Sequence, residues 1–336
     1  MAQITIDGST PVTFHCDETD TIMRAALRSG IGFPYSCNVG ACGNCRFQLL
    51  EGEVEHVQSS PRAWTERDEK RQRYLGCQAR PKTDCRIKLR TDEQYEPGTR
   101  PVPATARLLA KTALTHDMTE FALELDTPLS FLAGQYALLG TPAIDSPRAY
   151  SMCNVSGGDT QWNFQIKRVP GGAMTEQLFD HLQPGDTLTF DGPFGTAYLR
   201  EDSDRDILCL AGGSGLSPMI AIARAAAEHP QLTQKRLDFV FGGRRPDDMC
   251  GEDLLSELPG FGATLHYHPA ISEDVPADEW AGLRGFVHDV ALQLFGEELR
   301  DKEIYFAGPP LMAQAVQKML FDLKVPFDQV HFDEFY

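Results

Sequence analysis

The sequence lacks the segments that direct a chain into or across a membrane. Its first residues contain neither a basic region nor an apolar stretch of signal-peptide type, so we expect no signal peptide. Its most apolar stretch, residues 207–227, is interrupted by a Gly-Gly-Ser-Gly run, Pro218 and Arg224, which excludes a membrane span. We therefore expect a cytoplasmic protein without a membrane partner.

Positive charge is also scarce. The chain has 31 Lys and Arg residues against 48 Asp and Glu residues, which gives a formal net charge of −17 at pH 7. Because binding to nucleic acid depends on basic groups that contact phosphates, this balance argues against a nucleic-acid partner. Nothing in the composition defines an oligomeric state, and a monomer is the default expectation.

The length of 336 residues allows two or three domains of ordinary size. A polar stretch over residues 92–103, rich in proline and without apolar periodicity, is the best linker candidate. We predict a first domain over 1–95, a linker over 96–104, a second domain over 105–200 and a third over 201–336.

Four cysteines have the spacing of an iron–sulfur site. Cys37, Cys42 and Cys45 follow the pattern C-x4-C-x2-C, and Cys77 follows after 31 intervening residues. This is the spacing of plant-type [2Fe-2S] sites, in which four thiolates hold two irons. Glycines within the loop allow sharp turns that direct backbone N–H groups toward an anionic cluster. We predict a redox centre whose metal ligands are Cys37, Cys42, Cys45 and Cys77.

Zinc and disulfides are the alternatives for these cysteines. Structural zinc sites usually pair cysteines in two short C-x2-C knuckles, whereas three cysteines crowd a single loop in this chain. Disulfides suit secreted chains, and a chain of cytosolic type keeps its thiols reduced. The spacing therefore favours iron and sulfide. The other cysteines lack ligand spacing and are expected in the core: Cys16, Cys85, Cys153, Cys209 and Cys250.

The first 95 residues are expected to form a small domain of β-grasp type with the cluster loop at one edge. A capped helix is predicted over 22–28, ending at Gly30, and a polar segment over 61–73 favours a second helix. Alternating apolar residues predict strands within 3–16, 46–50, 54–57 and 85–89.

Residues from 105 onward alternate short strands with turns, which is typical of a small antiparallel barrel. Arg148 can pair with a phosphate, and Tyr150 can lie flat against an aromatic ring. A Gly-Gly turn at 171–172 precedes a helix predicted over 175–181, whose first N–H groups are free to bind an anion. Each feature alone is also consistent with an ordinary turn or a core tyrosine. Strands are predicted at 106–112, 120–125, 135–139, 162–169 and 187–190.

Residues after 206 alternate strands with helices, which predicts a doubly wound parallel sheet. Gly-rich turns at 212–215 and 308–310 follow two of the strands, and ligands of such sheets bind at the carboxyl ends of the strands. Tight turns need glycine even without a nucleotide, so each turn alone is weak evidence. Strands are predicted at 207–211, 237–241 and 303–307, and helices at 217–228 and 312–323.

Taken in this order, the motifs resemble the reductase components of multicomponent aromatic-ring oxygenases, members of the ferredoxin–NADP reductase superfamily with a fused N-terminal ferredoxin. The resemblance covers essentially the whole chain. Residues 148–151 (RAYS) are similar to the R-x-Y-[ST] flavin motif, and residues 171–175 (GGAMT) to the pyrophosphate turn. Residues 212–218 (GGSGLSP) resemble the nicotinamide-nucleotide loop, and residues 332–336 (FDEFY) the acidic and aromatic C-terminal segment. Ala307 is a departure, since many members have a cysteine there.

The resemblance implies a multidomain α+β fold: a β-grasp ferredoxin, an antiparallel flavin-binding β-barrel and an α/β doubly wound parallel nucleotide-binding domain. It implies a [2Fe-2S] cluster, FAD and NADH as cofactors. Tyr150 would stack on the flavin, Ser151 would hydrogen-bond near its N5 atom, and Phe335 would lie near its opposite face, which makes these the implied catalytic residues. The implied cofactor-binding residues are Arg148, Tyr150, Ser151, Val169, Gly171, Gly172, Met174, Thr175, Gly212, Gly213, Ser214, Gly215, Arg244, Gly308 and Pro309.

The implied function is that of an NADH-dependent electron-transfer reductase. Electrons would pass through FAD and the cluster to the terminal oxygenase of an aromatic-hydrocarbon dioxygenase or monooxygenase system, or to its small Rieske or plant-type ferredoxin. The resemblance favours NADH, although Arg244 and Arg245 could reach a 2′-phosphate that Asp247 and Asp248 would oppose. A redox-sensing regulatory protein and a stand-alone electron carrier on the same fold remain alternatives.

Overall fold

The computed structural model describes residues 1–8 and 10–335. Ser9 and Tyr336, the last residue of the acidic and aromatic C-terminal segment, lie outside the described residues. The chain forms three units in sequence order, each built around its own main sheet. We call them the N-terminal unit (residues 2–88), the barrel (102–194) and the parallel-sheet unit (206–334), after their first and last strand residues.

The N-terminal unit has the β-grasp topology that its sequence predicts. Its elements are β1 (Ala2–Ile6), β2 (Val12–Cys16), α1 (Ile22–Arg28), β3 (Arg46–Glu51), β4 (Val54–His56), α2 (Glu66–Lys70), β5 (Arg73–Leu75), β6 (Ala79–Pro81) and β7 (Cys85–Lys88). The main sheet has the order β2-β1-β7-β3-β5, and β1 and β7 are its one parallel pair. Five of the seven residues of α1 are buried, because an apolar helix face must cover the sheet.

The barrel is a six-stranded sheet with the order β11-β10-β13-β8-β9-β12. Its neighbouring strands are antiparallel, and a bridge between Met152 and Phe164 joins its two edges, so the predicted antiparallel barrel is confirmed. Its elements are β8 (Val102–Ala113), β9 (Met118–Leu125), β10 (Tyr136–Gly140), β11 (Arg148–Ser151), β12 (Gln161–Lys167), α3 (Ala173–Glu176) and β13 (Thr187–Phe194).

The parallel-sheet unit confirms the predicted doubly wound fold. Its sheet has the order β17-β16-β15-β14-β18-β19, and all its paired neighbours are parallel. The strands are β14 (Asp206–Gly212), β15 (Leu237–Gly243), β16 (Leu265–Ile271), β17 (Leu283–Arg284), β18 (Lys302–Gly308) and β19 (Val330–Glu334). The helices are α4 (Leu216–Glu228), α5 (Glu252–Ser256), α6 (Val287–Phe295) and α7 (Pro310–Asp322).

Several element bounds differ from the predictions made from sequence, and β12, for example, ends at Lys167 and not at Val169. Helix α3 begins at Ala173, directly after the Gly-Gly turn, and continues from Gln177 to His181 as a wider π-helical turn. Strand β8 begins at Val102, inside the segment expected as a linker, because Val102 pairs with Gly192 of β13. The polar segment 61–73 is helical only in α2, where a capping box formed by Thr65 fixes the start of the helix.

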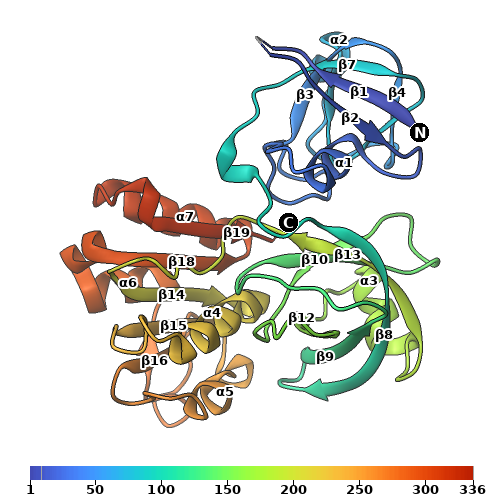
Figure 1. Cartoon of the computed structure of the whole chain (residues 1–336). Helices are drawn as coiled ribbons and strands as arrows, with labels where there is room; N and C mark the ends of the chain where they lie inside the picture. Colours follow the sequence, from blue (N-terminus) through green and yellow to red (C-terminus); the bar gives the residue numbers. More distant parts are fainter. Residues whose placement is uncertain (9, 336) are drawn as a thin grey trace.

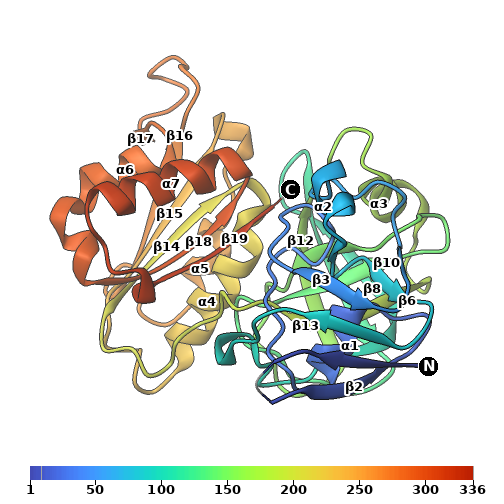
Figure 2. The same ribbon diagram turned by 90° about the horizontal axis from the view of Figure 1, so that it is seen from above.

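The three units meet around the barrel. Figure 1 shows the N-terminal unit (blue) above the barrel and the C-terminus of the chain at the junction of the three units. In the view from above, the N-terminal unit overlies the barrel, and the parallel-sheet unit stands beside it (Figure 2). Tyr136, Leu138 and Phe194 of the barrel are buried in the same hydrophobic core as the N-terminal unit, so these two units are packed against each other.

A close approach of two backbones makes Gly215 necessary for the parallel-sheet unit. A Cβ atom on Gly215 would lie 1.9 Å from the carbonyl oxygen of Ala307 in the adjacent strand. We expect Gly215→Ala to destabilise the protein by about 1–3 kcal/mol and to lower its Tm by several degrees in calorimetry. Gly98→Ala is the control, since a Cβ there meets nothing within 4 Å. Equal Tm values for the two variants would contradict the prediction.

Candidate functional site

The four predicted metal ligands come together at one point of the N-terminal unit. Cys37, Cys42 and Cys45 lie in the loop between α1 and β3, and Cys77 follows β5 after one residue. The Sγ atoms of Cys45 and Cys77 are 3.4 Å apart, and the thiols of Cys37 and Cys42 are also in contact. Cys42 is half-buried and the other three are buried, so the sulfurs form a compact, largely enclosed group.

Backbone N–H groups of the loop point at these sulfurs. The N–H groups of Ala41 and Cys42 lie 3.4 and 3.3 Å from Sγ of Cys37. The Cys42 thiol, and after it these N–H groups, lower the pKa of Cys37 although burial alone would raise it, whereas the same contact and burial raise the pKa of Cys42. Gly40 and Gly43 have φ values of 80° and 85°, the left-handed conformation that lets the loop turn its N–H groups inward.

These features fit an anionic cluster of two irons. Four thiolate donors are the ligand set of a plant-type [2Fe-2S] centre. N–H groups directed at the sulfurs stabilise their negative charge, and burial limits access of water. The residues present therefore match the group that their spacing predicts.

The cluster loop is also bonded to the barrel. The hydroxyl of Tyr136, in β10, donates a hydrogen bond to the backbone oxygen of Ser36, the residue before Cys37. The N–H of Gly195 donates to the hydroxyl of Tyr35 over 2.8 Å. The sequence separations are 100 and 160 residues, which explains why no local sequence pattern indicated either bond.

The predicted flavin motif forms β11, an edge strand of the barrel. Tyr136 of β10 lies opposite Ser151, so the flavin motif is one strand away from the tyrosine that holds the cluster loop. Tyr150 is partly exposed, and burial raises its pKa, so its phenol is neutral. The guanidinium of the exposed Arg148 bonds to the Ser146 backbone oxygen and hydroxyl at 2.7 Å each. These contacts keep Arg148 beside its own strand.

The predicted pyrophosphate turn is shaped by its own side chains. Thr175 Oγ1 donates toward the backbone oxygens of Gly172 and Val169, at 3.0 and 3.1 Å, and accepts from the N–H of Val169. Met174 is buried in the barrel core, and a Cβ on Gly172 would lie 2.7 Å from Thr175 Oγ1. Thr175 and Met174 therefore hold the shape of the turn. Gly171, with φ of 69° and open space around it, is its accessible point.

The predicted nucleotide turns lie side by side at the carboxyl ends of β14 and β18. A Cβ on Gly212 or on Gly308 would approach the Sδ atom of Met312 to 2.5 or 2.8 Å, so both turns pack under the start of α7. Gly213 has φ of 56°, and among the described residues a Cβ there would meet only the side chain of Lys167, at 3.7 Å. The structure therefore brings together Gly212, Gly213, Ser214, Gly215, Gly308 and Pro309.

Arg244 directly follows β15 at the same edge of the sheet. Its N–H and that of Arg245 donate to Oδ2 of Asp248 at 3.0 and 3.1 Å. Burial would raise the pKa of Asp248, but these N–H groups and the ammonium of Lys167 lower it. Asp248 is therefore a fixed negative charge next to the two arginines.

The C-terminal strand places Phe335 near the barrel. Residues on β19 alternate between two faces, with Phe332 stacked on Phe306 on one face and His331 stacked on Tyr305 on the other. Phe335 follows the strand, donates its N–H to Gly308 and packs against the core that contains Tyr305. Asp333 shares the face of His331. Its Oδ2 atom is buried without a hydrogen-bond partner among the described residues, and burial raises its pKa to about 7.

Reasoning from sequence missed a serine that joins the parallel-sheet unit to the barrel. The hydroxyl of Ser217 donates to the backbone oxygen of Ser151 over 2.6 Å and accepts from the N–H of Gln165 over 3.1 Å. Ser217 is 1% exposed, so both bonds are shielded from water. The one local indication in the sequence is that Ser217 lies within residues 212–218, the segment that resembles a nucleotide loop.

Three family models match successive parts of the chain. The 2Fe-2S iron-sulfur cluster binding domain matches residues 4–82, the oxidoreductase FAD-binding domain matches 105–198, and the oxidoreductase NAD-binding domain matches 209–318. These matches confirm the predicted [2Fe-2S], FAD and NAD cofactors. No helix within residues 1–8 and 10–335 has the length and apolarity needed to cross a membrane.

Relatives match the chain over nearly its whole length. A ferredoxin–NAD(P)(+) reductase of Metapseudomonas resinovorans is 37% identical, with 100% of both chains covered. The ferredoxin–NAD(+) reductase component of an alkene monooxygenase system of Xanthobacter autotrophicus is 36% identical over 96% of this chain and 98% of its own. A solved ferredoxin reductase in carbazole 1,9a-dioxygenase superposes with a TM-score of 0.90 at 37% identity, covering 100% of this chain and 98% of that one.

Fold, ligand sites and relatives agree with the family that the motifs resembled. The oxidoreductase class and the three-part architecture predicted from sequence are thereby confirmed. The chain belongs to the family of oxygenase reductase components in which a plant-type [2Fe-2S] domain is fused to the FAD-binding and NAD-binding domains of the ferredoxin–NADP reductase type.

Proposed function

We propose that this chain takes electrons from NADH and delivers them to the terminal oxygenase of an aromatic dioxygenase or monooxygenase system, or to the small ferredoxin that serves it. The observation that carries the proposal is the short protein connection between the two redox sites. Ser36, next to Cys37, is bonded to Tyr136, and Tyr136 lies opposite Ser151 of the flavin motif.

When they are bound, the flavin can accept a hydride from NADH and the cluster can pass on electrons one at a time. The protein residues bind and orient them. Cys37, Cys42, Cys45 and Cys77 hold the irons, and the N–H groups of the loop stabilise the sulfurs. With FAD bound, Tyr150 would stack on the flavin, Ser151 would hydrogen-bond near its N5 atom, and Phe335 would lie near its opposite face. No side chain has to act as a general acid or base.

The remaining groups bind the phosphates and the nucleotide. Arg148, Val169, Gly171, Gly172, Met174 and Thr175 form the pyrophosphate side of the flavin pocket in this proposal, with Met174 and Thr175 acting through the shape of the turn. Gly212, Gly213, Ser214, Gly215, Gly308 and Pro309 form the nicotinamide side, and Arg244 lies where the adenosine ribose would bind. Their common position at the carboxyl edge of the sheet supports this assignment.

Domain limits, location and partners belong to the same proposal. We place the domain boundaries at residues 95 and 200, with the barrel domain starting at Val102, where β8 begins, and not at the expected residue 105. We also propose a cytoplasmic monomer that binds no nucleic acid and no membrane. The net charge of −17 supports the absence of a nucleic-acid partner. The names of the relatives include both a dioxygenase and a monooxygenase system, so either type of acceptor suits the proposal.

A visible absorption spectrum before and after anaerobic addition of NADH tests this function. Flavin and iron–sulfur bands should both be present in the purified protein, and both should bleach. Bands that stay unchanged with NADH and with NADPH would refute the proposal and favour a redox sensor.

The cluster ligands can be tested separately from the flavin. We expect Cys42→Ser to abolish reduction of one-electron protein acceptors, because it removes a thiolate ligand of the cluster. Oxidation of NADH by ferricyanide should continue, since the barrel and the parallel-sheet unit are unchanged. Cys85→Ser is the matched control, because Cys85 is a buried thiol of the same unit whose Sγ contacts the backbone oxygens of Glu53 and Thr83 and which is not among the predicted cluster ligands. Equal loss of both activities in Cys42→Ser would refute the proposed electron path.

The choice of nucleotide follows from the acidic groups around Arg245. Its guanidinium is paired with Glu273 at 3.6 Å and Glu279 at 3.9 Å, and Asp248 accepts its N–H. Because a 2′-phosphate would meet these carboxylates, we expect kcat/KM for NADH to exceed that for NADPH by at least about tenfold.

The double variant Glu273→Gln, Glu279→Gln should raise kcat/KM for NADPH and so reduce the ratio of kcat/KM between NADH and NADPH. Asp274→Asn should leave the preference unchanged, because Asp274 lies in the same loop but is paired with Arg284. A wild-type preference for NADPH would show that the acidic groups do not set the choice.

A further inference from the structure

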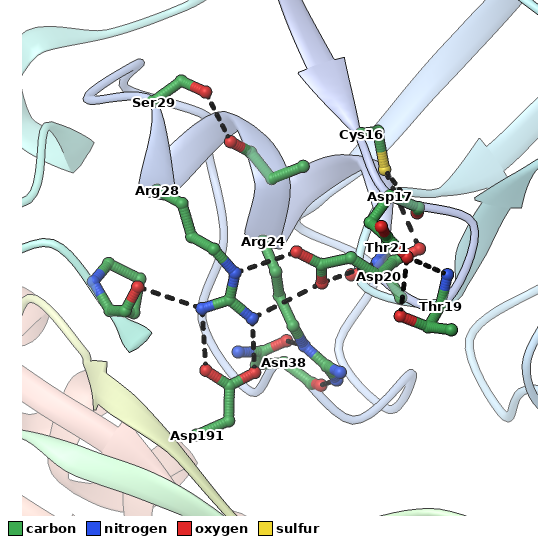
Figure 3. A network of polar contacts seen from close by, with 12 residues as sticks. Cys16, Asp17, Thr19, Asp20, Thr21, Arg24, Arg28, Ser29, Asn38 and Asp191 are labelled. Carbon is green, nitrogen blue, oxygen red and sulfur yellow. Dashed lines mark hydrogen bonds and ion pairs between the residues drawn. The ribbon is translucent and has the colours of Figure 1, made fainter. Parts of the chain in front are cut away.

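Besides the hydrogen bonds of Tyr136 and Tyr35 and the shared apolar core, an arginine at the end of α1 joins the N-terminal unit to the barrel by an ion pair. The guanidinium of Arg28 grips both carboxylate oxygens of Asp191 in β13, at 2.8 Å each (Figure 3). Its Nε donates to Asp20 at 2.8 Å, and its Nη1 also donates to the backbone oxygen of Pro101 at 3.0 Å. Arg28 therefore links its own unit, the connecting segment and the barrel.

This ion pair differs from an ordinary surface salt bridge. The side chains of Arg28, Asp20 and Asp191 are 23%, 15% and 16% exposed, so solvent screens them only partly. Two parallel N–H···O bonds between a guanidinium and a carboxylate fix direction as well as distance. Burial would lower the pKa of Arg28, but Asp191 and Asp20 hold it above its usual range, so the charge is permanent.

A second arginine on the same helix holds the cluster loop. Arg24 lies one turn before Arg28, so both project from one face of α1. Its Nε donates to Oδ1 of Asn38 at 3.0 Å and its Nη2 to the backbone oxygen of Asn38 at 3.2 Å (Figure 3). Asn38 follows Cys37 and has φ of 56°, a left-handed conformation that asparagine adopts more readily than most residues, and the two bonds from Arg24 hold its side chain and carbonyl in place. Helix α1 thus connects the metal-ligand loop to the barrel through two side chains.

Arg28 is bonded to β13, which belongs to the same side of the barrel as the flavin motif. We call this side, formed by β13, β10 and β11, the flavin-motif wall. Asp191 of β13 lies opposite Leu138 of β10, and the next strand in the sheet is β11 with Tyr150 and Ser151. The order β13-β10-β11 means that a shift of the N-terminal unit along this wall would change its separation from the flavin motif.

We propose that Arg28 is a positioning residue for electron transfer between the barrel and the cluster, acting through Asp191 on one side and through α1 and Arg24 on the other. The inference rests on the proposed function. The step moves one electron at a time, with no bond made or broken, from reduced flavin to oxidised cluster, and NADH replaces the electrons. The rate of such a step falls steeply with separation, so a docking contact that sets the separation controls the rate.

Variants on both sides of the ion pair test the proposal in the complete, cofactor-loaded chain. Arg28→Met and Asp191→Asn should each slow bleaching of the cluster band after anaerobic mixing with NADH by at least about tenfold. Bleaching of the flavin band and NADH oxidation by ferricyanide should keep the wild-type rate. Arg28→Lys retains the charge but not the two-pronged contact, and an intermediate rate is expected.

Cofactor content and susceptibility to proteolysis should be measured alongside the bleaching rates. Both variants should keep wild-type iron and flavin content, and proteolysis within residues 92–101 should accelerate, because the N-terminal unit is held less firmly against the barrel by the contacts that remain. Arg86→Met is the control, because Arg86 pairs with Glu51 within the N-terminal unit and away from the barrel. If Arg28→Met loses its cluster, Asp191→Asn still breaks the same contact from the barrel side.

Two outcomes would overturn the inference. One is an unchanged rate of cluster bleaching in Asp191→Asn and Arg28→Met. The other is a parallel fall of flavin and cluster bleaching, which would indicate general damage and not a positioning role. Both outcomes require that wild-type protein bleaches fully with NADH. Failure of the wild type to bleach would instead refute the proposed function.

Discussion

Electron transfer between two bound centres requires a short and constant separation, and in this chain non-covalent contacts have to maintain it. The barrel stands between its neighbours and is bonded to each through a hydroxyl. Tyr136 donates to Ser36 of the cluster loop, and Ser217 of the parallel-sheet unit donates to Ser151. Because Tyr136 and Ser151 lie opposite each other in β10 and β11, both neighbours are held at the same place on the barrel. That place carries the flavin motif.

Features that depend on local sequence were predictable. The four cysteines could be identified because a loop that surrounds two irons imposes a fixed spacing on its ligands. Helix α1 and strands β14, β15 and β18 were predictable because apolar periodicity and glycine turns are local signals. The position of the Gly-rich turns at the strand ends followed from the general topology of parallel sheets.

Contacts between the three units could not be predicted, because no local sequence pattern indicates them. Arg28 and Asp191 are separated by 163 residues, and each alone resembles an ordinary surface charge in the sequence. The start of β8 at Val102 depends on its pairing with Gly192 of β13. The proline-rich sequence around Val102 gives no indication of this pairing. Asp333 belongs to the acidic and aromatic C-terminal segment in the sequence, but its burial arises only when β19 joins the sheet beside β18. The ion pair, the start of β8 and the burial of Asp333 are each determined by tertiary packing and not by the local sequence.

The junction between the cluster loop and the barrel has an apolar centre and a charged rim. Its centre contains Tyr35, Tyr136 and Phe194, whose rings pack at centroid distances of 6.0 to 6.3 Å. Burial raises the pKa of both tyrosines, so their hydroxyls stay neutral while they donate and accept hydrogen bonds. The Arg28–Asp191 pair lies outside this centre, where partial exposure limits the cost of desolvating the charges. The Arg28–Asp191 pair therefore fixes the direction of the contact, and the aromatic centre excludes water from the junction between the cluster loop and the barrel.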